Sequence, residues 1–237
     1  MRKENRPDAG VVRRIGRRCV SLLLCLAAAV VAAVATPNER LARGEIAVTT
    51  LPAPHRGIVC GQSQGVVSAP VDRVWAVLNR SGEFADYMPR TRVSWLIDPS
   101  ARADVGVRLK WERPELETTL EGYRRADWPG NTVLLYNVLD VPFPVSDRWY
   151  LLEMTRDTVA HSIRWEQVTG NLKSNDGLWQ LAAWPDSGHT LVTYTTSVEP
   201  GVAVPGFILA IGVRQSLPGI IKSLRRRVTQ AERAGRQ

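Results

Sequence analysis

Cysteine and histidine are scarce in this chain, which has three of each among its 237 residues. Two of the cysteines, Cys19 and Cys25, lie in an N-terminal segment that we expect to be removed, so the mature chain would keep only Cys60. One cysteine cannot form an internal disulfide. We therefore expect Cys60 to be a buried residue of a strand.

The sequence motifs of several enzyme classes are also missing. There is no HExxH, no GxSxG, no glycine-rich phosphate loop and no paired CxxC, so metal-dependent hydrolysis, acyl transfer and nucleotide chemistry have no support. No cofactor, no metal and no catalytic residue are predicted. Inward-facing carboxylates would suit a cyclase, but we expect the candidates to lie on the surface: Glu112, Glu121, Glu153 and Glu166.

Excess positive charge is confined to one end of the chain. The net charge is +8, and residues 1–35 carry seven basic and two acidic side chains, a net of +5. The remaining residues carry 24 basic and 21 acidic side chains, a net of only +3. This distribution argues against a nucleic-acid partner, which would require a basic surface on the folded domain.

The N-terminal segment, residues 1–35, is predicted to be a secretory signal peptide. Its basic residues precede an uncharged run, Val20–Ala35, which ends in Ala33-Val34-Ala35, a typical cleavage site. The mature protein is therefore expected in the periplasm or outside the cell. An uncleaved inner-membrane anchor through residues 20–35 remains an alternative, although sixteen apolar residues fall short of the roughly 20 that span a bilayer.

Residues 36–56 contain three prolines and no sustained period, which predicts a linker. The folded domain is expected over residues 57–233. It would begin with a strand, Ile58–Val67, and two short helices, Val71–Leu78 and Glu83–Tyr87.

Strands are predicted for the next hundred residues. Alternating apolar and polar residues indicate strands at Val105–Glu112 and Glu117–Ala126. Thr132–Leu139 and Arg148–Met154 are apolar on both faces, which places them at the centre of a sheet or beneath a large covering element.

The chain ends in a predicted helix that begins at Pro205 and is kinked or split by Pro218. Helices segregated from a run of strands indicate the α+β class. We expect a curved antiparallel sheet of six to seven strands, with the long C-terminal helix on its concave side. A sheet of this width leaves a cavity beside one helix, and such cavities bind apolar small molecules.

Three segments resemble the START lipid-transfer family and its helix-grip relatives, the polyketide cyclase-like and coenzyme Q-binding proteins. They are Val66–Pro89, Val141–Trp149 and Gly177–Trp184, the last followed by Glu199-Pro200-Gly201 and Val204-Pro205. The resemblance covers roughly Gly57 to Arg227. It implies a helix-grip fold with a hydrophobic ligand in a tunnel and, usually, no catalytic machinery.

Aromatic residues are the main candidates for the wall of the tunnel, although tryptophans at strand spacing also suit a plain core. The residues predicted to contact ligand are Trp111, Tyr136, Arg148, Trp149, Trp179, Tyr194, Phe207 and Ile211. Arg148 would meet the polar end of the ligand or, alternatively, pair with Asp147 at the sheet rim. The loop residues Pro142, Phe143 and Pro144 would touch a membrane or form a packed hairpin.

The sequence thus predicts an exported, monomeric carrier of one apolar small molecule: a lipid, a sterol-like compound or a quinone. Its second partner would be a membrane surface, contacted transiently. Two alternatives remain open at this stage. One is a cyclase or dehydratase that uses the same cavity, and the other is a ligand-free module that binds another protein.

Overall fold

The computed structural model describes residues 36–55, 57–108, 110–141, 146–201 and 206–235. The predicted signal peptide lies outside these residues. The elements below belong to one unit that begins at Pro37. No helix in the described ranges is long and apolar enough to cross a membrane.

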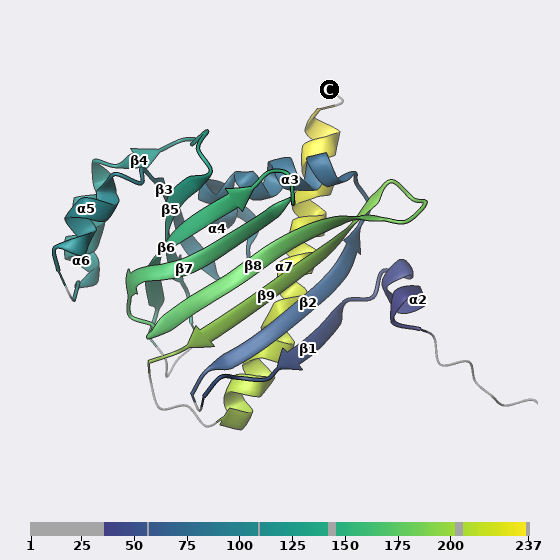
Figure 1. Ribbon diagram of the computed structural model, residues 1–237, viewed down its shortest axis with the longest axis horizontal. Helices are drawn as coiled ribbons and strands as arrows, with labels where there is room; N and C mark the ends of the chain where they lie inside the picture. Colours follow the sequence, from purple (N-terminus) through teal and green to yellow (C-terminus); the bar gives the residue numbers. More distant parts are fainter. Residues whose placement is uncertain (1–35, 56, 109, 142–145, 202–205, 236–237) are drawn as a thin grey trace, which may run out of the picture. The chain divides into compact units, whose positions relative to one another are not determined.

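A nine-stranded antiparallel sheet forms the centre of the unit, with the order β1-β2-β9-β8-β7-β6-β5-β3-β4 (Figure 1). Its strands are β1 Ala47–Leu51, β2 Val59–Val67, β3 Thr91–Ile97, β4 Arg124–Arg125, β5 Thr132–Leu139, β6 Arg148–Asp157, β7 Ser162–Gly170, β8 Ser174–Trp184 and β9 His189–Glu199. The α+β class and the curved antiparallel sheet are confirmed, but the expected count of six to seven strands was too low. Two of the nine strands, β1 and β4, are short and lie at the sheet's edges.

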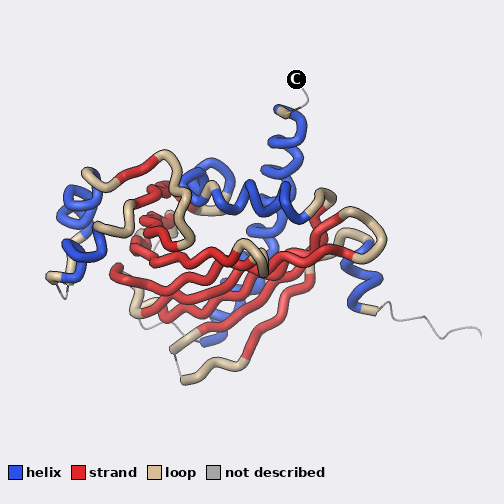
Figure 2. Tube along the Cα trace, turned by 45° about the horizontal axis from the view of Figure 1, so that its top comes forward, coloured by secondary structure: helices blue, strands red, loops and turns tan. Residues whose placement is uncertain are grey.

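Helices lie on both faces of this sheet. They are α2 Pro37–Ala42, α3 Val71–Asn79, the 3-10 helix η1 Ser81–Glu83, α4 Phe84–Tyr87, α5 Ala101–Gly106, α6 Arg113–Glu121 and α7 Gly206–Ala234. The long helix α7 crosses one face, where it packs mainly on β2 and β1 (Figures 1 and 2). The predicted C-terminal helix is confirmed. It is not split, because α7 runs unbroken through Pro218.

Close contact between α7 and β2 depends on Gly65. A Cβ atom at this position would lie 2.7 Å from Cγ2 of Ile221 and 3.1 Å from Nη2 of Arg225, so only glycine lets the helix approach this strand. Arg225 then holds the helix in place. Its Nε donates to the carbonyl of Val66 at 2.9 Å, and its Nη1 donates to the carbonyl of Gly44 at 2.8 Å.

Two hydrophobic clusters form, one on each face of the sheet. The inner cluster lies between the sheet and α3, α4 and α7, and the outer cluster lies beneath α5 and α6. Strand β5 contributes alternate residues to both, for example Leu135 to the inner cluster and Leu134 to the outer. The large covering element predicted for Thr132–Leu139 is therefore the α5–α6 segment.

The strand predicted at Val105–Glu112 was wrong. Val105 belongs to α5, and the chain after it turns so that Nε1 of Trp111 donates to the Val105 carbonyl at 3.0 Å. Both residues are buried in the outer cluster, whereas Val107 between them is 78% exposed. The sequence does alternate here, but among the described members Val105 and Trp111 reach the outer cluster and Val107 does not.

The strand predicted at Glu117–Ala126 was also wrong, since helix α6 continues to Glu121 and only the two residues of β4 pair with β3. Pro114 suits the first turn of this helix. Leu116 and Leu120, four residues apart and fully buried, form its apolar stripe. Apolar residues four positions apart are typical of a helix, although they also occur at every second position of a strand.

Part of the segment predicted as a linker is ordered. Within residues 36–56, β1 pairs with β2 from Ala47 opposite Gln64 to Leu51 opposite Cys60. An edge strand is held mainly by backbone hydrogen bonds, so it needs no apolar period. The expectation for Cys60 is confirmed, because it is buried on β2, with its Sγ 3.4 Å from Oγ of Ser197.

The contact at Gly65 leads to a first prediction. We expect Gly65→Ala to lower the free energy of unfolding by about 1–3 kcal/mol, because the new methyl group must push α7 away from β2. Urea unfolding would measure the change. Gly106→Ala is the matched control: no atom lies within 4 Å of its Cβ position, so stability should hold or rise by at most about 1 kcal/mol. Equal midpoints for both variants would contradict the close contact.

Candidate functional site

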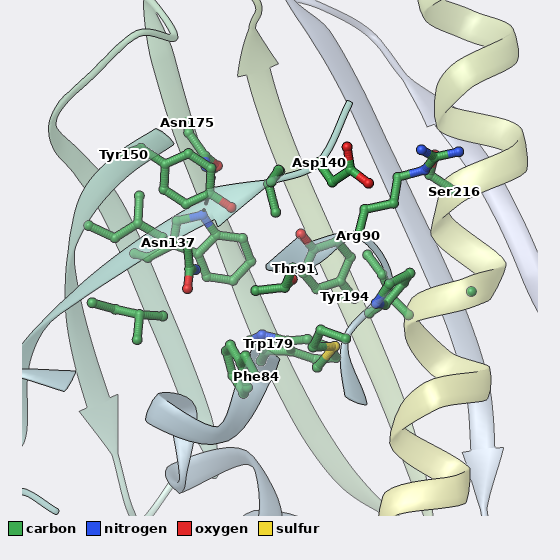
Figure 3. Close-up of a pocket in the computed structure, with 18 of the residues that line it drawn as sticks. Phe84, Arg90, Thr91, Asn137, Asp140, Tyr150, Asn175, Trp179, Tyr194 and Ser216 are labelled. Atoms are coloured by element: carbon green, nitrogen blue, oxygen red, sulfur yellow. Dashed lines mark hydrogen bonds between the residues drawn. The ribbon is translucent and has the colours of Figure 1, made fainter. Parts of the chain in front are cut away.

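A cavity of about 870 Å³ lies between the inner face of the sheet and α7 (Figure 3). Strands β5 to β9, helix α4 and residues 88–91 that follow it, and residues 216–220 of α7 contribute its walls. Much of the lining is aliphatic or sulfur-containing, including Leu135, Leu152, Met154, Met88 and Ile220. The surface is therefore suited to an apolar molecule.

Three aromatic rings form one wall of the cavity. Trp165 stacks on Tyr194 with ring centroids 5.4 Å apart, and Trp179 contacts the same tyrosine at 4.5 Å. Gly177 makes room for this group, because a Cβ there would lie 2.0 Å from Cζ2 of Trp165. Burial raises the pKa of Tyr194 to about 12, with a hydrogen bond to Thr196 acting in the opposite direction.

A group of neutral polar side chains interrupts the apolar wall. Asn137, Tyr150 and Asn175 come from β5, β6 and β8, and all three line the cavity. Nε1 of Trp165 donates to Oδ1 of Asn175 at 3.1 Å. Burial raises the pKa of Tyr150 well above its ordinary value, and hydrogen bonds from Asn137 and Asn175 act weakly in the other direction. Tyr150 therefore remains a neutral hydroxyl.

Charged side chains of the described lining lie elsewhere, at the mouth. The two charged side chains, Arg90 and Asp140, are exposed. They lie near the exposed Ser216 of α7, away from Asn137 and Tyr150 (Figure 3). The backbone amide of Asp140 donates to the carbonyl of Arg90 at 2.8 Å, which ties the end of β5 to the turn before β3. The mouth is thus charged, whereas the interior is neutral.

Of the residues predicted to contact ligand, the structure places Trp179 and Tyr194 on the cavity wall. It places Trp111, Tyr136 and Trp149 in the outer cluster, on the opposite face of the sheet. The reason is the alternation of a strand: on β6, Tyr150 and Leu152 point into the cavity, so Trp149 between them must point away.

Arg148 is buried at the start of β6, where its Nη1 donates to Oγ of Ser146 at 3.1 Å, but it is not part of the described lining. The alternative prediction was an ion pair between Arg148 and Asp147. In the structure, Asp147 instead forms ion pairs with Arg92 and Arg113. The side chains of Phe207 and Ile211 lie outside the described residues. So does the loop that carries Pro142, Phe143 and Pro144.

Sequence reasoning missed Asn137, Tyr150 and Asn175. A signal existed for Asn137, since it is the only amide in Thr132–Leu139, a run that is otherwise apolar apart from its first residue and a tyrosine. A polar residue in a strand buried on both faces needs a partner. Tyr150 lies opposite Asn137 on the neighbouring strand β6, but Asn175 comes from β8, so the sequence could not identify the whole group.

No group of three or more histidine, cysteine, aspartate or glutamate residues in the described part of the chain is arranged to hold a metal ion. A family model described as polyketide cyclase/dehydrase and lipid transport matches residues 67–225. The chain belongs to this family. No curated protein matches it closely.

Solved structures in the family's fold are similar to this chain. The STAR-related lipid transfer protein of Xanthomonas axonopodis is 21% identical, with a TM-score of 0.55, over 78% of this chain and 93% of that one. Human StAR-related lipid transfer protein 5 is 10% identical, with a TM-score of 0.55, over 80% and 84%. A START superfamily protein of Mycobacterium smegmatis is 12% identical, with a TM-score of 0.51, over 73% and 98%. The predicted START-like helix-grip fold is confirmed.

The outer cluster leads to a second prediction. The Tyr136 hydroxyl donates to Oε1 of Glu117 at 2.8 Å, and Nε of Arg113 donates to the same oxygen at 2.8 Å. Tyr136→Phe should lower the free energy of unfolding by about 1–3 kcal/mol, because a hydrogen bond to a charged group is lost. Glu117→Gln keeps an acceptor for the hydroxyl and should cost less. Unchanged urea unfolding of Tyr136→Phe would contradict a role for this contact in holding α6.

The raised pKa of Tyr194 leads to a third prediction. Between pH 10 and about 12 the folded protein keeps a proton that the unfolded chain releases, so the free energy of unfolding must fall as the pH rises through this range. Tyr194→Phe should make that fall shallower. Urea unfolding as a function of pH would measure it, and equal slopes for both proteins would show that Tyr194 titrates normally.

Proposed function

We propose that this protein binds one apolar small molecule, a lipid, a sterol-like compound or a quinone, and carries or shields it. The observation that carries the proposal is the cavity of about 870 Å³ between the sheet and α7. The names of two structural relatives, both lipid transfer proteins, point in the same direction.

Burial in such a cavity is sufficient for useful affinity. A ligand that hides about 400 Å² of apolar surface gains about 10 kcal/mol at roughly 25 cal/mol per Å², before the cost of association. Leucine, methionine and aromatic side chains supply the matching surface. No reaction is needed for this function.

The two alternatives have less support from the described residues. A cyclase needs a general acid or base at its ligand, but the described lining has no histidine and one carboxylate, that of Asp140, which is exposed at the mouth. A ligand-free interaction module would fill the space with its own side chains. Trp165 and Trp179 instead pack along the wall and leave the volume open.

Export belongs to the same proposal. We infer that residues 1–35 direct the chain out of the cytoplasm, where the carrier would meet a membrane transiently as a monomer. The loop that carries Phe143 would contact that membrane. Support for this contact comes from the two residues that precede the loop in the chain. Asp140 and Val141 both line the cavity.

The fourth prediction concerns the protein recovered from the periplasm or the medium. Native mass spectrometry of this protein tests the proposed function. We expect a co-purified lipid or quinone adduct at one per chain, and a protein mass that lacks residues 1–35. A protein that carries no adduct and takes up none from total lipid extract would overturn the carrier function. An intact N-terminus would overturn only cleavage.

A pair of variants on α7 sharpens the same experiment. Ser216→Trp places a large ring at the mouth and should reduce the adduct several-fold by blocking entry. Lys222→Trp adds the same ring at an exposed position of the same helix that does not line the cavity, so its adduct should match that of the unmodified protein. Equal losses in both variants would indicate a general effect on folding.

A further inference from the structure

Two opposite charges lie unpaired at the mouth of the cavity. Arg90 and Asp140 are the charged side chains of the described lining, and both are exposed. Within the described part of the chain, neither side chain forms a hydrogen bond or an ion pair, not even with the other. The charges nearest in sequence differ, since Arg92 forms an ion pair with Asp147. Arg90 and Asp140 are thus available to a third group.

The backbone holds these two residues side by side. The amide of Asp140 donates to the carbonyl of Arg90 at 2.8 Å, and Figure 3 shows both side chains beside α7. Arg90 has a φ of 60°, a left-handed conformation that is uncommon for arginine and costs free energy. The other described non-glycine residues with positive φ, His161 and Asp186, lie in hairpin turns. A strained residue at a cavity mouth indicates a role in binding.

The interior and the mouth suit different parts of one molecule. The described lining has no charged side chain in the interior, so an ion there would lose its hydration without gaining a counterion. A head group at the mouth stays partly hydrated, because Arg90 and Asp140 are exposed, and this keeps the desolvation cost of ion pairing low. The geometry favours an amphiphile with its polar end at the mouth.

The signs of the two charges decide which head group fits. A head group with one charge, anionic or cationic, is attracted by one side chain and repelled by the other, so the two effects nearly cancel. A head group with both charges is attracted twice when its anionic group lies beside Arg90 and its cationic group beside Asp140.

We propose that the ligand is a zwitterionic amphiphile, whose anionic group pairs with Arg90 and whose ammonium group pairs with Asp140, while its apolar part fills the cavity. Lipids with a phosphocholine or phosphoethanolamine head group belong to this class. This inference rests on the proposed function and deepens it, since it names the class of lipid that the mouth selects.

Four probes of similar chain length test the inference: dodecylphosphocholine, dodecanoate, dodecyltrimethylammonium and uncharged 1-dodecanol, each below its micelle concentration and at low ionic strength. We expect dodecylphosphocholine to bind more tightly than either singly charged probe, by about two- to fivefold, as exposed ion pairs allow. Quenching of tryptophan fluorescence, with Trp165 and Trp179 in the cavity wall, would report the affinities.

Two variants locate the head group. Arg90→Gln should weaken dodecylphosphocholine and dodecanoate and strengthen dodecyltrimethylammonium, whereas Asp140→Asn should weaken dodecylphosphocholine and dodecyltrimethylammonium and strengthen dodecanoate. The zwitterion is then the probe that both variants weaken, by about two- to fivefold each, and 1-dodecanol should bind unchanged. Urea midpoints of both variants should match that of the unmodified protein, because neither side chain has a described partner.

Matched controls make the same changes away from the cavity. Arg164→Gln on β7 and Asp186→Asn in the turn between β8 and β9 alter exposed side chains that do not line the cavity. Both should leave the affinities of all four probes unchanged. Equal effects of the control and mouth variants would show that net charge alone matters, and would overturn the proposed head-group site.

The outcomes separate the two proposals. If none of the probes binds, the carrier function itself fails. If the probes bind but a singly charged one binds most tightly, or the mouth variants change no affinity, the carrier function stands and the zwitterion preference is overturned. A gain of dodecylphosphocholine affinity in either mouth variant would also overturn it, since the head group would then lie in the opposite orientation or elsewhere.

Discussion

The contact of α7 with β2 at Gly65 is the constraint on which the rest of this structure depends. The missing side chain lets Ile221 and Arg225 approach the strand closely, and Arg225 fixes the helix to the carbonyls of Val66 and Gly44. The helix is therefore held toward one edge of a nine-stranded sheet. One helix cannot cover so wide a surface, so the opposite side of the inner face remains open as the cavity.

The outer cluster gives that cavity a firm wall. Helices α5 and α6 bury the far side of β5 and β6, and the Arg113–Glu117–Tyr136 contacts hold α6 against the sheet. Strands that are buried on both faces must place every side chain in one cluster or the other. Asn137 consequently lies on the cavity side of β5, in the same wall as Tyr150 and Asn175.

Local patterns predicted much of the fold. The strand before the first helix, the helices near Val71 and Glu83, and the apolar stripe of α7 involve residues within one or two turns of each other. The same reasoning failed at Val105–Glu112, where an alternation that suits a strand occurs in a segment folded as a helix and a turn. Tertiary contacts decided the structure of this segment, because the Trp111 side chain donates a hydrogen bond to the carbonyl of Val105 and the segment does not pair with a strand.

By itself, the sequence determined the α+β class, the antiparallel sheet around a terminal helix and the family, because these follow from short-range periodicity and from the order of segments. Only the tertiary structure decided which face of the sheet each aromatic residue occupies. Tyr136 and Tyr150 look alike in sequence, yet one holds α6 and the other lines the cavity. Strand register sets that choice, and register depends on pairing between residues far apart in the chain.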